Sequence, residues 1–243
     1  MSAAEVVVVT GASSGVGASI TRKLAASGRT VAAIARSPDA LARVASAPGG
    51  GRIVPVAVDI TDAQAIRRAI DGIERDIGPI ATLINNTGVF DLTEFHHQDL
   101  AMIDRIIATN LSGTMYCTHA ALAHMLPRRQ GRIIGVASVA GTRGIPGQAT
   151  YCASKHGMVG FFEALAQELQ PQGILVTTLC PGGIDTPLWS RGDDPAPGSV
   201  RYPGDREALI APEEIAELIE FLLSRPVGTV YKRLVFFPAN EWH

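Results

Sequence analysis

The sequence is poor in charged residues and in cysteine, and it has no long hydrophobic run. Charged residues make up 18% of the 243 residues and the formal net charge is −2, whereas about a quarter of an average soluble protein is charged. This balance argues against a nucleic-acid-binding surface and against a polybasic membrane contact. Hydrophobic residues make up 47%, so the chain can bury a large core, and we expect part of its surface to be covered in an oligomer.

The cysteines and the N-terminal residues indicate in which cellular compartment we expect the protein. Cys117, Cys152 and Cys180 are odd in number and form no Cys-x-x-Cys pair, which disfavours a disulfide framework or a zinc ribbon and suits a reducing environment. The apolar run near the N-terminus is too short for the core of a signal peptide, and no basic residue precedes it. No run approaches the roughly 18 apolar residues of a membrane helix. We therefore expect a cytoplasmic protein without a membrane contact.

Short apolar runs alternate along the chain with segments of helical periodicity. Several runs are continuous stretches of Val, Ile, Ala and Leu, which is typical of strands buried on both faces of a parallel sheet. This alternation predicts an α/β fold, with a single Rossmann-type domain over residues 1–243 and a doubly wound parallel sheet. The expected strands are Glu5 to Thr10, Thr30 to Ala35, Gly51 to Val58, Ile80 to Asn85, Arg132 to Ala137, Ile174 to Cys180 and Arg233 to Phe237. The expected helices are Val16 to Ser27, Pro38 to Ala47, Asp62 to Ile77, Asp99 to Leu126, Tyr151 to Gln170 and Pro212 to Ser224.

Two segments break this alternation. Residues 185–210 are long and rich in turn residues, and they follow the carboxyl end of an expected strand, so we expect a substrate lid there. Gly113 and Asn110 lie inside the long expected helix. They predict a kink at that point.

A glycine-rich turn follows the first expected strand. Gly11, Gly15 and Gly17 have the spacing G-x3-G-x-G. Glycine lets a backbone approach a pyrophosphate closely, and the amides that open the next helix point at such an anion. Taken alone, this spacing fits an ordinary glycine turn as well as a nucleotide site.

Tyr151 and Lys155 lie four residues apart, thirteen residues after Ser138. Positions i and i+4 share one face of a helix. A phenol titrates near 10, so proton exchange near neutral pH requires a fall of about three units, or roughly 4 kcal/mol. A nearby cation can supply much of this. Such a pair is ordinarily a solvated helix face, and only Ser138 and Asn110 upstream favour a catalytic interpretation.

Six motifs together are more specific than any one of them. In order and approximate spacing, the chain resembles the short-chain dehydrogenase/reductase family at Thr10-Gly-x3-Gly-x-Gly17, Asn85-Asn86-Thr87-Gly88, Asn110, Ser138, Tyr151-x3-Lys155 and Pro181-Gly182. The resemblance covers essentially the whole chain, with one departure at Thr87, where the family usually has alanine. It implies an oxidoreductase that moves a hydride between a nicotinamide dinucleotide and a ketone, aldehyde or secondary alcohol. It also implies a homo-oligomer, either a tetramer or a dimer.

The resemblance also implies roles for particular residues. Tyr151 would be the general acid/base, Ser138 would orient the substrate oxygen, Lys155 would lower the phenol's pKa and bind the nicotinamide ribose, and Asn110 would hold a proton-relaying water. The cofactor would contact Gly11, Ser13, Ser14, Gly15, Val16, Gly17, Arg36, Ser37, Asp59, Ile60, Asn86, Gly88, Tyr151, Lys155, Pro181, Gly182, Ile184 and Thr186. The substrate pocket would be lined by Phe90, Val139, Ile145, Gln148, Gly183, Leu188 and Trp189, an apolar set that suits a hydrophobic or mid-sized carbonyl compound.

The end of the second strand bears on which dinucleotide is used. NAD-preferring proteins of this fold place an acidic residue there, whereas this chain has Ala35 followed by Arg36 and Ser37. A guanidinium can bind a 2′-phosphate bidentately, so we expect NADP(H), with NAD(H) as the alternative. Ser14 stands where NADP-binding relatives often carry a second basic anchor.

Other interpretations differ from this one in testable ways. An NAD-dependent dehydrogenase of the same family differs only in its cofactor. A nonenzymatic dinucleotide-sensing protein is expected to lack Tyr151 or Lys155, and both are present. His96 and His97 are adjacent, and we expect their side chains to diverge without an acidic partner nearby. His119 and His124 are out of helical register, so no metal site is predicted.

Overall fold

The computed structural model describes residues 5–47, 50–187 and 209–239. Its strands are β1 (Val6–Thr10), β2 (Thr30–Ala35), β3 (Arg52–Ala57), β4 (Ile80–Asn85), β5 (Gly131–Val136), β6 (Ile174–Pro181) and β7 (Arg233–Phe236). Its α-helices are α1 (Gly15–Ala26), α2 (Pro38–Ala45), α3 (Ala63–Asp76), α4 (Leu100–Ile107), α5 (Gly113–Arg128), α6 (Ala149–Leu169) and α7 (Pro212–Ser224). Shorter helical turns are η1 (Phe95–His97), η2 (Ala108–Ser112), η3 (Val139–Gly141) and η4 (Gln170–Gln172).

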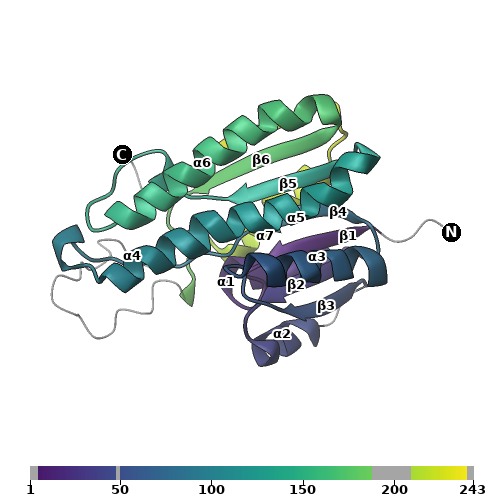
Figure 1. The fold of residues 1–243 in the computed structure, drawn as a ribbon, viewed down its shortest axis with the longest axis horizontal. Helices are drawn as coiled ribbons and strands as arrows, with labels where there is room; N and C mark the ends of the chain where they lie inside the picture. The colour runs from purple at the N-terminus through teal and green to yellow at the C-terminus, as the bar shows by residue number, and fades with distance from the viewer. Residues whose placement is uncertain (1–4, 48–49, 188–208, 240–243) are drawn as a thin grey trace.

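The strands form one parallel sheet in the order β3-β2-β1-β4-β5-β6-β7. From β1 the chain runs outward through β2 and β3 and then returns to β4 on the other side of β1, so the strand order reverses between β1 and β4. All carboxyl ends point toward the end of the molecule where α4 lies (Figure 1). In open sheets of this kind ligands bind in the crevice outside such a reversal. The predicted α/β fold is confirmed.

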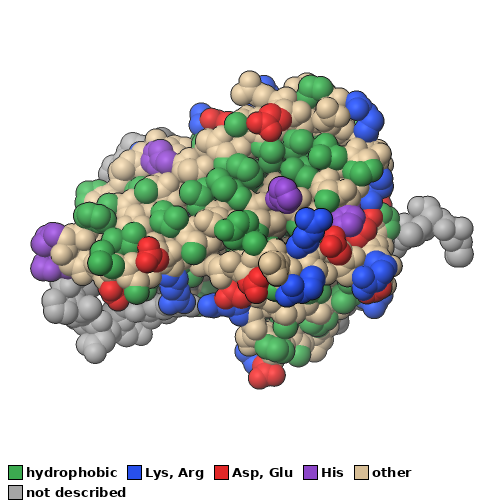
Figure 2. All heavy atoms as spheres, in the orientation of Figure 1, with side chains coloured by type: hydrophobic (Ala, Val, Ile, Leu, Met, Phe, Trp, Pro, Cys, Tyr) green, Lys and Arg blue, Asp and Glu red, His purple; other side chains and the backbone are tan. Residues whose placement is uncertain are grey.

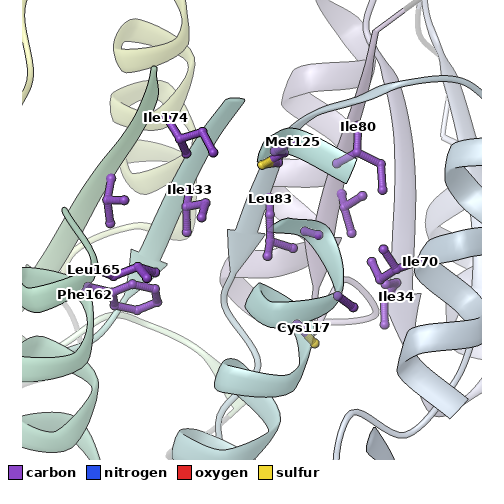
Figure 3. Packing of buried hydrophobic residues seen from close by; sticks show 14 of the residues in the cluster. Ile34, Ile70, Ile80, Leu83, Cys117, Met125, Ile133, Phe162, Leu165 and Ile174 are labelled. Carbon is purple, nitrogen blue, oxygen red and sulfur yellow. The ribbon is translucent and has the colours of Figure 1, made fainter. Parts of the chain in front are cut away.

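Helices cover both faces of the sheet, and each face has its own apolar core. One core joins the sheet to α3, α5 and α6 (Figure 3). The other joins it to α1, α2 and α7. A Cβ atom on Gly135 of β5 would lie 2.0 Å from the ring of Phe162 in α6, so glycine is required there for the helix to pack on the strand.

The long helix expected at residues 99–126 is interrupted. It consists of α4, the π-helical turn η2 and α5, and single π-turns of this kind often occur at functional sites. Asn110 lies within η2. Gly113 begins α5, and a Cβ atom there would lie 2.8 Å from the side chain of Ile60. The kink is therefore confirmed, and the glycine serves a close contact with the segment after β3.

The segment after β6 is described only at its two ends. Ile184 forms an isolated parallel bridge with Ile210, Asp185 N–H donates to the Ile210 carbonyl at 2.9 Å, and Ile210 N–H donates to the Gly183 carbonyl at 2.9 Å. The remainder of the expected lid, residues 188–208, lies outside the described residues. None of the described helices combines the length and apolar character that crossing a bilayer needs.

Candidate active site

Hydrogen bonds join the carboxyl ends of β1 and β4. The hydroxyl of Thr10, the last residue of β1, accepts hydrogen bonds from the backbone N–H groups of Asn86 (3.0 Å) and Thr87 (3.1 Å). The Asn86 side-chain amide donates to the Thr10 carbonyl at 3.1 Å. Our sequence analysis assigned no role to this threonine. Its signal was a polar residue that closes an otherwise all-valine strand.

The glycine turn is shaped by contacts that exclude any side chain. Gly11 and Gly15 have φ values of +66° and +49°, a region that glycine occupies most readily. A Cβ atom on Gly11 would lie 2.9 Å from Thr87 Cα, and one on Gly17 would lie 2.2 Å from the Gly11 carbonyl oxygen. The turn therefore lies directly against the segment after β4.

The turn leads into the N-terminus of α1. The Ser14 side chain is exposed and makes no capping hydrogen bond, while Ser13 is half-buried in the turn and Val16 is buried in the first turn of the helix. The first amides of an α-helix have no intrahelical acceptor. Such amides, at the end of a glycine-rich turn, form an anion-binding site.

The segment after β6 reaches the same turn. A Cβ atom on Gly15 would lie 3.4 Å from Cβ and Cγ2 of Thr186. Pro181 is the last residue of β6, and Gly182 N–H donates to the Phe236 carbonyl of β7 at 2.8 Å. Predicted cofactor residues that lie about 170 positions apart in the sequence therefore meet across one crevice.

The segments that follow β2 and β3 contain both exposed and buried residues. Ala35 is buried at the end of β2, whereas Arg36 and Ser37 are exposed, and Ser37 caps α2 by accepting from Ala40 N–H at 3.3 Å. After β3, Asp59 is exposed and one of its oxygens accepts from the N–H and the hydroxyl of Thr61, both at 2.9 Å. The Ile60 side chain is buried against Gly113, so only its backbone could face a ligand.

Tyr151 and Lys155 lie one turn apart on α6, and both are buried. Lys155 Nζ lies 5.6 Å from the centre of the Tyr151 ring and donates to the Val136 carbonyl of β5 at 3.1 Å. Ser138, just after β5, lies near enough to the Tyr151 side chain for its hydroxyl to lower the pKa of the phenol. Its oxygen also accepts from Ala140 N–H at 3.1 Å. The phenol, the ammonium and the hydroxyl therefore form one cluster, as the sequence predicts.

Burial changes the acidity of this pair. Loss of solvation raises the pKa of Tyr151 well above its ordinary value, while the nearby Ser138 hydroxyl acts in the opposite direction. The same loss of solvation lowers the pKa of Lys155 to about 8. In this structure burial is the largest influence on the acidity of the phenol, and the role of Lys155 in lowering the phenol's pKa stays a prediction. The ammonium faces the aromatic ring and the Val136 carbonyl, and burial disfavours both charged forms.

Asn110 joins the segment after β4 to α6. Its side-chain oxygen accepts from Val89 N–H at 2.8 Å. Its amide nitrogen donates to the Val89 carbonyl at 2.9 Å and to Ser154 Oγ at 3.1 Å. A Cβ atom on neighbouring Gly88 would lie 3.6 Å from Asn110 Oδ1 and 3.7 Å from Lys155 Nζ. Both amide hydrogens thus bind protein groups, and the role of Asn110 in holding a water stays a prediction.

The predicted substrate residues collect beside the phenol. The Phe90 ring meets the Tyr151 ring edge-on, with centroids 5.0 Å apart. Phe90 and Ile145 pack against a small cluster of Ala140, Tyr151 and Cys152. Cys152 was not among our predicted pocket residues. Val139 and Gln148 are buried within 12 residues of Tyr151 in the sequence, and Gly183 is buried just after β6, whereas Leu188 and Trp189 lie outside the described residues.

Thr87, which replaces the alanine usual in the family motif, places a hydroxyl group in a buried position. Its hydroxyl oxygen is buried and has no hydrogen-bond partner within the described part of the chain. The same holds for the side-chain oxygen of Asn85, whose amide nitrogen donates to Thr118 Oγ1 at 3.0 Å. Two unsatisfied polar atoms therefore lie at the end of β4.

The histidines partly contradict our expectation. The side chain of His124 is paired with the Asp71 carboxylate at 2.7 Å. His96 and His97, however, do not diverge: their ring centroids are 4.0 Å apart, and Glu94 Oε2 lies 3.8 Å from His96 Nε2. The expectation that no acidic group lies near these rings is wrong, because the η1 turn brings Glu94 beside them.

Comparison with known proteins agrees with this arrangement. The family model described as short chain dehydrogenase matches residues 5–195. An inactive 2-(S)-hydroxypropyl-CoM dehydrogenase of Xanthobacter autotrophicus is 38% identical over 219 residues, covering 87% of this chain and 94% of that protein. An acetoacetyl-CoA reductase of Paracoccus denitrificans is 37% identical over 228 residues, covering 93% of each. The crystal structure of an actinorhodin polyketide ketoreductase variant with NADPH has a TM-score of 0.85 at 28% identity and covers 98% of each chain.

The family match and the relatives span the same elements that carry the glycine turn, the Tyr151 cluster and the Asn110 contact. On these grounds the chain belongs to the short-chain dehydrogenase family of oxidoreductases.

Proposed function

We propose that this protein is an NADP(H)-dependent oxidoreductase that interconverts a ketone or aldehyde with an alcohol. The observation that carries the proposal is the buried cluster of Tyr151, Ser138 and Lys155 at the carboxyl edge of the sheet, beside the segment that borders the glycine turn. A phenol and a hydroxyl that lie this near to each other can both bond to one substrate oxygen. This is the arrangement that general acid catalysis on a carbonyl requires.

Each residue has a defined task in this proposal. Tyr151 donates its proton to the substrate oxygen during reduction, and its raised pKa keeps it protonated at neutral pH. Ser138 orients that oxygen. Lys155, with a pKa near 8, can exchange a proton near neutral pH and would restore the proton of the phenol. The nicotinamide, when bound, supplies or accepts the hydride.

The chain's own residues fit a dinucleotide. The glycine turn has backbone positions that a Cβ atom would fill, at Gly11 and Gly17, and the N-terminus of α1 offers amides to a pyrophosphate. At the adenosine end no carboxylate stands at Ala35, and the Arg36 side chain is exposed beside it. Asp59 would face the adenine. This combination favours a 2′-phosphate, and NAD(H) remains the alternative cofactor.

The substrate side supports an apolar carbonyl compound. The ring of Phe90 and the side chain of Ile145 line the approach to Tyr151. Two relatives bear names that refer to keto groups, a reductase of acetoacetyl-CoA and a polyketide ketoreductase. A β-ketoacyl thioester is therefore the first compound to test, followed by a panel of hydrophobic ketones and aldehydes.

A nonenzymatic, dinucleotide-sensing role is the second candidate. One relative is named as inactive although it is 38% identical, so membership of the family alone does not establish turnover. The presence of Tyr151, Lys155, Ser138 and Asn110 favours the enzyme. Purified protein is mixed with NADPH and each compound of the panel, and NADPH oxidation is followed. Binding of NADPH without oxidation by any compound would favour the sensing role.

We also propose that the protein is cytoplasmic and forms a homo-oligomer, a tetramer or a dimer. The three cysteines are free and buried, as in proteins of a reducing compartment. Hydrophobic side chains gather over α5 and α6 on one face (Figure 2), and Tyr116, Leu126 and Leu100 are exposed on α5 and α4. Light scattering coupled to size exclusion would measure the assembly.

A further inference from the structure

The loop between β4 and α4 contains a tight turn that brings three potential metal ligands together. In η1, His97 N–H donates to the Glu94 carbonyl at 2.9 Å and Gln98 N–H donates to the Phe95 carbonyl at 3.2 Å. Glu94 is the N-cap residue of this turn, and its carboxylate lies close to the His97 ring. The His96 ring lies against the His97 ring, with centroids 4.0 Å apart.

The ligand atoms of Glu94, His96 and His97 all lie within 4.8 Å of one another. Imidazole nitrogens and a carboxylate oxygen bind Zn²⁺ at about 2.0 to 2.2 Å, so two ligands of a tetrahedral ion are about 3.4 Å apart. The separation of Glu94 Oε2 and His96 Nε2, 3.8 Å, is already close to this. All three side chains are exposed and can rotate to close the remaining gap.

Hydrogen bonds fix the backbone on both sides of the η1 turn. The Gln98 side-chain amide donates to Asp91 Oδ2 at 2.9 Å, which closes the base of the loop. Thr93 N–H donates to the Gly147 carbonyl at 2.9 Å, and the Thr150 hydroxyl bonds to the Gln98 side-chain oxygen. Because the main chain is fixed on both sides of η1, binding an ion would order only side chains, which lowers its entropic cost.

We propose that Glu94, His96 and His97 form a surface site for a divalent transition-metal ion of the zinc type. The donor set of two imidazoles and one carboxylate matches the preference of Zn²⁺, Co²⁺ and Ni²⁺ and leaves a further position for water. Histidine side chains gather at the same end of the molecule as α4 (Figure 2). Buried thiols cannot compete for the ion, since all three cysteines are buried.

The site lies on the loop that also carries Phe90, whose ring contacts Tyr151. The same loop is hydrogen-bonded to Gly147 and Thr150, which lie four residues and one residue before Tyr151. A bound ion would therefore hold a loop that lines the substrate side of the cluster. The metal site does not depend on the proposed function, and binding alone tests it.

The test is a titration of the full chain with Co²⁺, followed by its visible absorption, and a competition with Zn²⁺ measured by calorimetry. We expect one ion per chain at micromolar free metal. His96→Ala and His97→Ala should each weaken binding by about tenfold or more, at least as much as loss of an outer-shell partner does. Glu94→Gln, which keeps an oxygen but loses the charge, should weaken binding less than the histidine changes.

The matched control is His119→Ala, because His119 is exposed on α5 and is outside the cluster. This variant should bind as the wild type does. Circular dichroism verifies that every variant is folded, which their exposed positions favour. The proposal is overturned if the wild type binds no ion at micromolar concentration, if His119→Ala weakens binding as much as His96→Ala does, or if the double variant His96→Ala/His97→Ala keeps the wild-type affinity.

Discussion

The ammonium of Lys155 lies 5.6 Å from the centre of the Tyr151 ring and donates its hydrogen bond to the Val136 carbonyl. Both side chains are buried, and burial holds the phenol protonated while it lowers the pKa of the amine to about 8. The buried ammonium is therefore costly to the folded protein at neutral pH, and a cost of this kind is common where residues are arranged for chemistry.

Replacing the lysine should stabilise the protein. The pKa of Lys155 falls from an ordinary 10.5 to about 8 on folding, which corresponds to a cost on the order of 3 kcal/mol at neutral pH. Between these two pH values the unfolded chain binds more protons, so the cost disappears as pH rises from about 8 to 10.5. Lys155→Met should raise the free energy of unfolding at pH 7 by roughly 1 to 3 kcal/mol, allowing for the lost hydrogen bond.

Urea unfolding at several pH values measures this effect. The difference in unfolding free energy between Lys155→Met and the wild type should shrink above pH 8, because the cost of burying the Lys155 charge disappears there. Groups such as Cys117 titrate in both proteins and cancel in this difference. Lys232→Met is the control, because Lys232 is exposed and its replacement should change stability by less than about 0.5 kcal/mol. A Lys155→Met variant that is destabilised at pH 7 would refute the assigned cost of burial.

Asn110 should matter to folding as well as to the site. Asn110→Ala removes three hydrogen bonds and leaves the buried N–H and carbonyl of Val89 without those partners. An unsatisfied buried polar group costs about 1 to 3 kcal/mol, so we expect a loss of roughly 2 to 4 kcal/mol in urea unfolding. Ser112→Ala, at a half-buried position of the same π-turn, should cost less than about 1 kcal/mol. Equal losses for both variants would contradict the contact role.

The close packing of α6 on β5 can be tested at a glycine. In Gly135→Ala the added Cβ would lie 2.0 Å from the Phe162 ring, and overpacking a core typically costs about 1 to 3 kcal/mol. At Gly144 an added Cβ meets no atom within 4 Å, so Gly144→Ala should stay within about 0.5 kcal/mol of the wild type. Thermal melts of the two variants should separate clearly. Matching melting temperatures would show that the sheet and the helix can move apart freely.

Cofactor choice depends on Ala35 and Arg36. Charge-assisted hydrogen bonds from Arg36 to a 2′-phosphate are worth roughly 1.5 to 3 kcal/mol, or about 10- to 150-fold in affinity. The wild type should prefer NADPH over NADH by that range in kcat/KM. Arg36→Ala should remove most of the preference by weakening NADPH, and Ala35→Asp should reverse it by placing a carboxylate beside the phosphate.

Steady-state kinetics with both cofactors decides the matter. Arg43→Ala, in the last turn of α2, serves as a control for a general loss of positive charge and should keep the wild-type ratio. If the wild type uses both cofactors equally, or if Arg36→Ala keeps its ratio, the arginine is a solvated residue and NAD(H) belongs in the account.

The sequence predicted the arrangement of elements well because each strand is marked by its own composition. The expected bounds of the strands at Thr30 and Ile80 and of the helix at Pro212 match the structure, and other bounds differ by one or two residues where helix and strand ends fray. Ser138 follows the carboxyl end of β5, and Tyr151 and Lys155 meet it because they share one face of α6, one turn apart. Local patterns therefore sufficed for the fold, whereas the cluster was predicted from the resemblance to a known family.

Other features depend on tertiary contacts that no local pattern reports. The acidity of Tyr151 follows from burial rather than from its spacing to Lys155. The need for glycine at position 113 follows from Ile60, which is distant in sequence. Glu94 lies near His96, contrary to expectation, where the chain enters the short 3₁₀ turn η1.

The proposed reaction is tested most directly by Tyr151→Phe, which keeps the ring and removes only the hydroxyl. With a β-ketoacyl thioester or the best carbonyl of the panel, NADPH oxidation should fall by about 10² to 10⁴, the usual contribution of a general acid, or roughly 3 to 5 kcal/mol. NADPH binding, measured by fluorescence titration, should stay nearly unchanged. Turnover within about threefold of the wild type would contradict the assignment of Tyr151 as the proton donor.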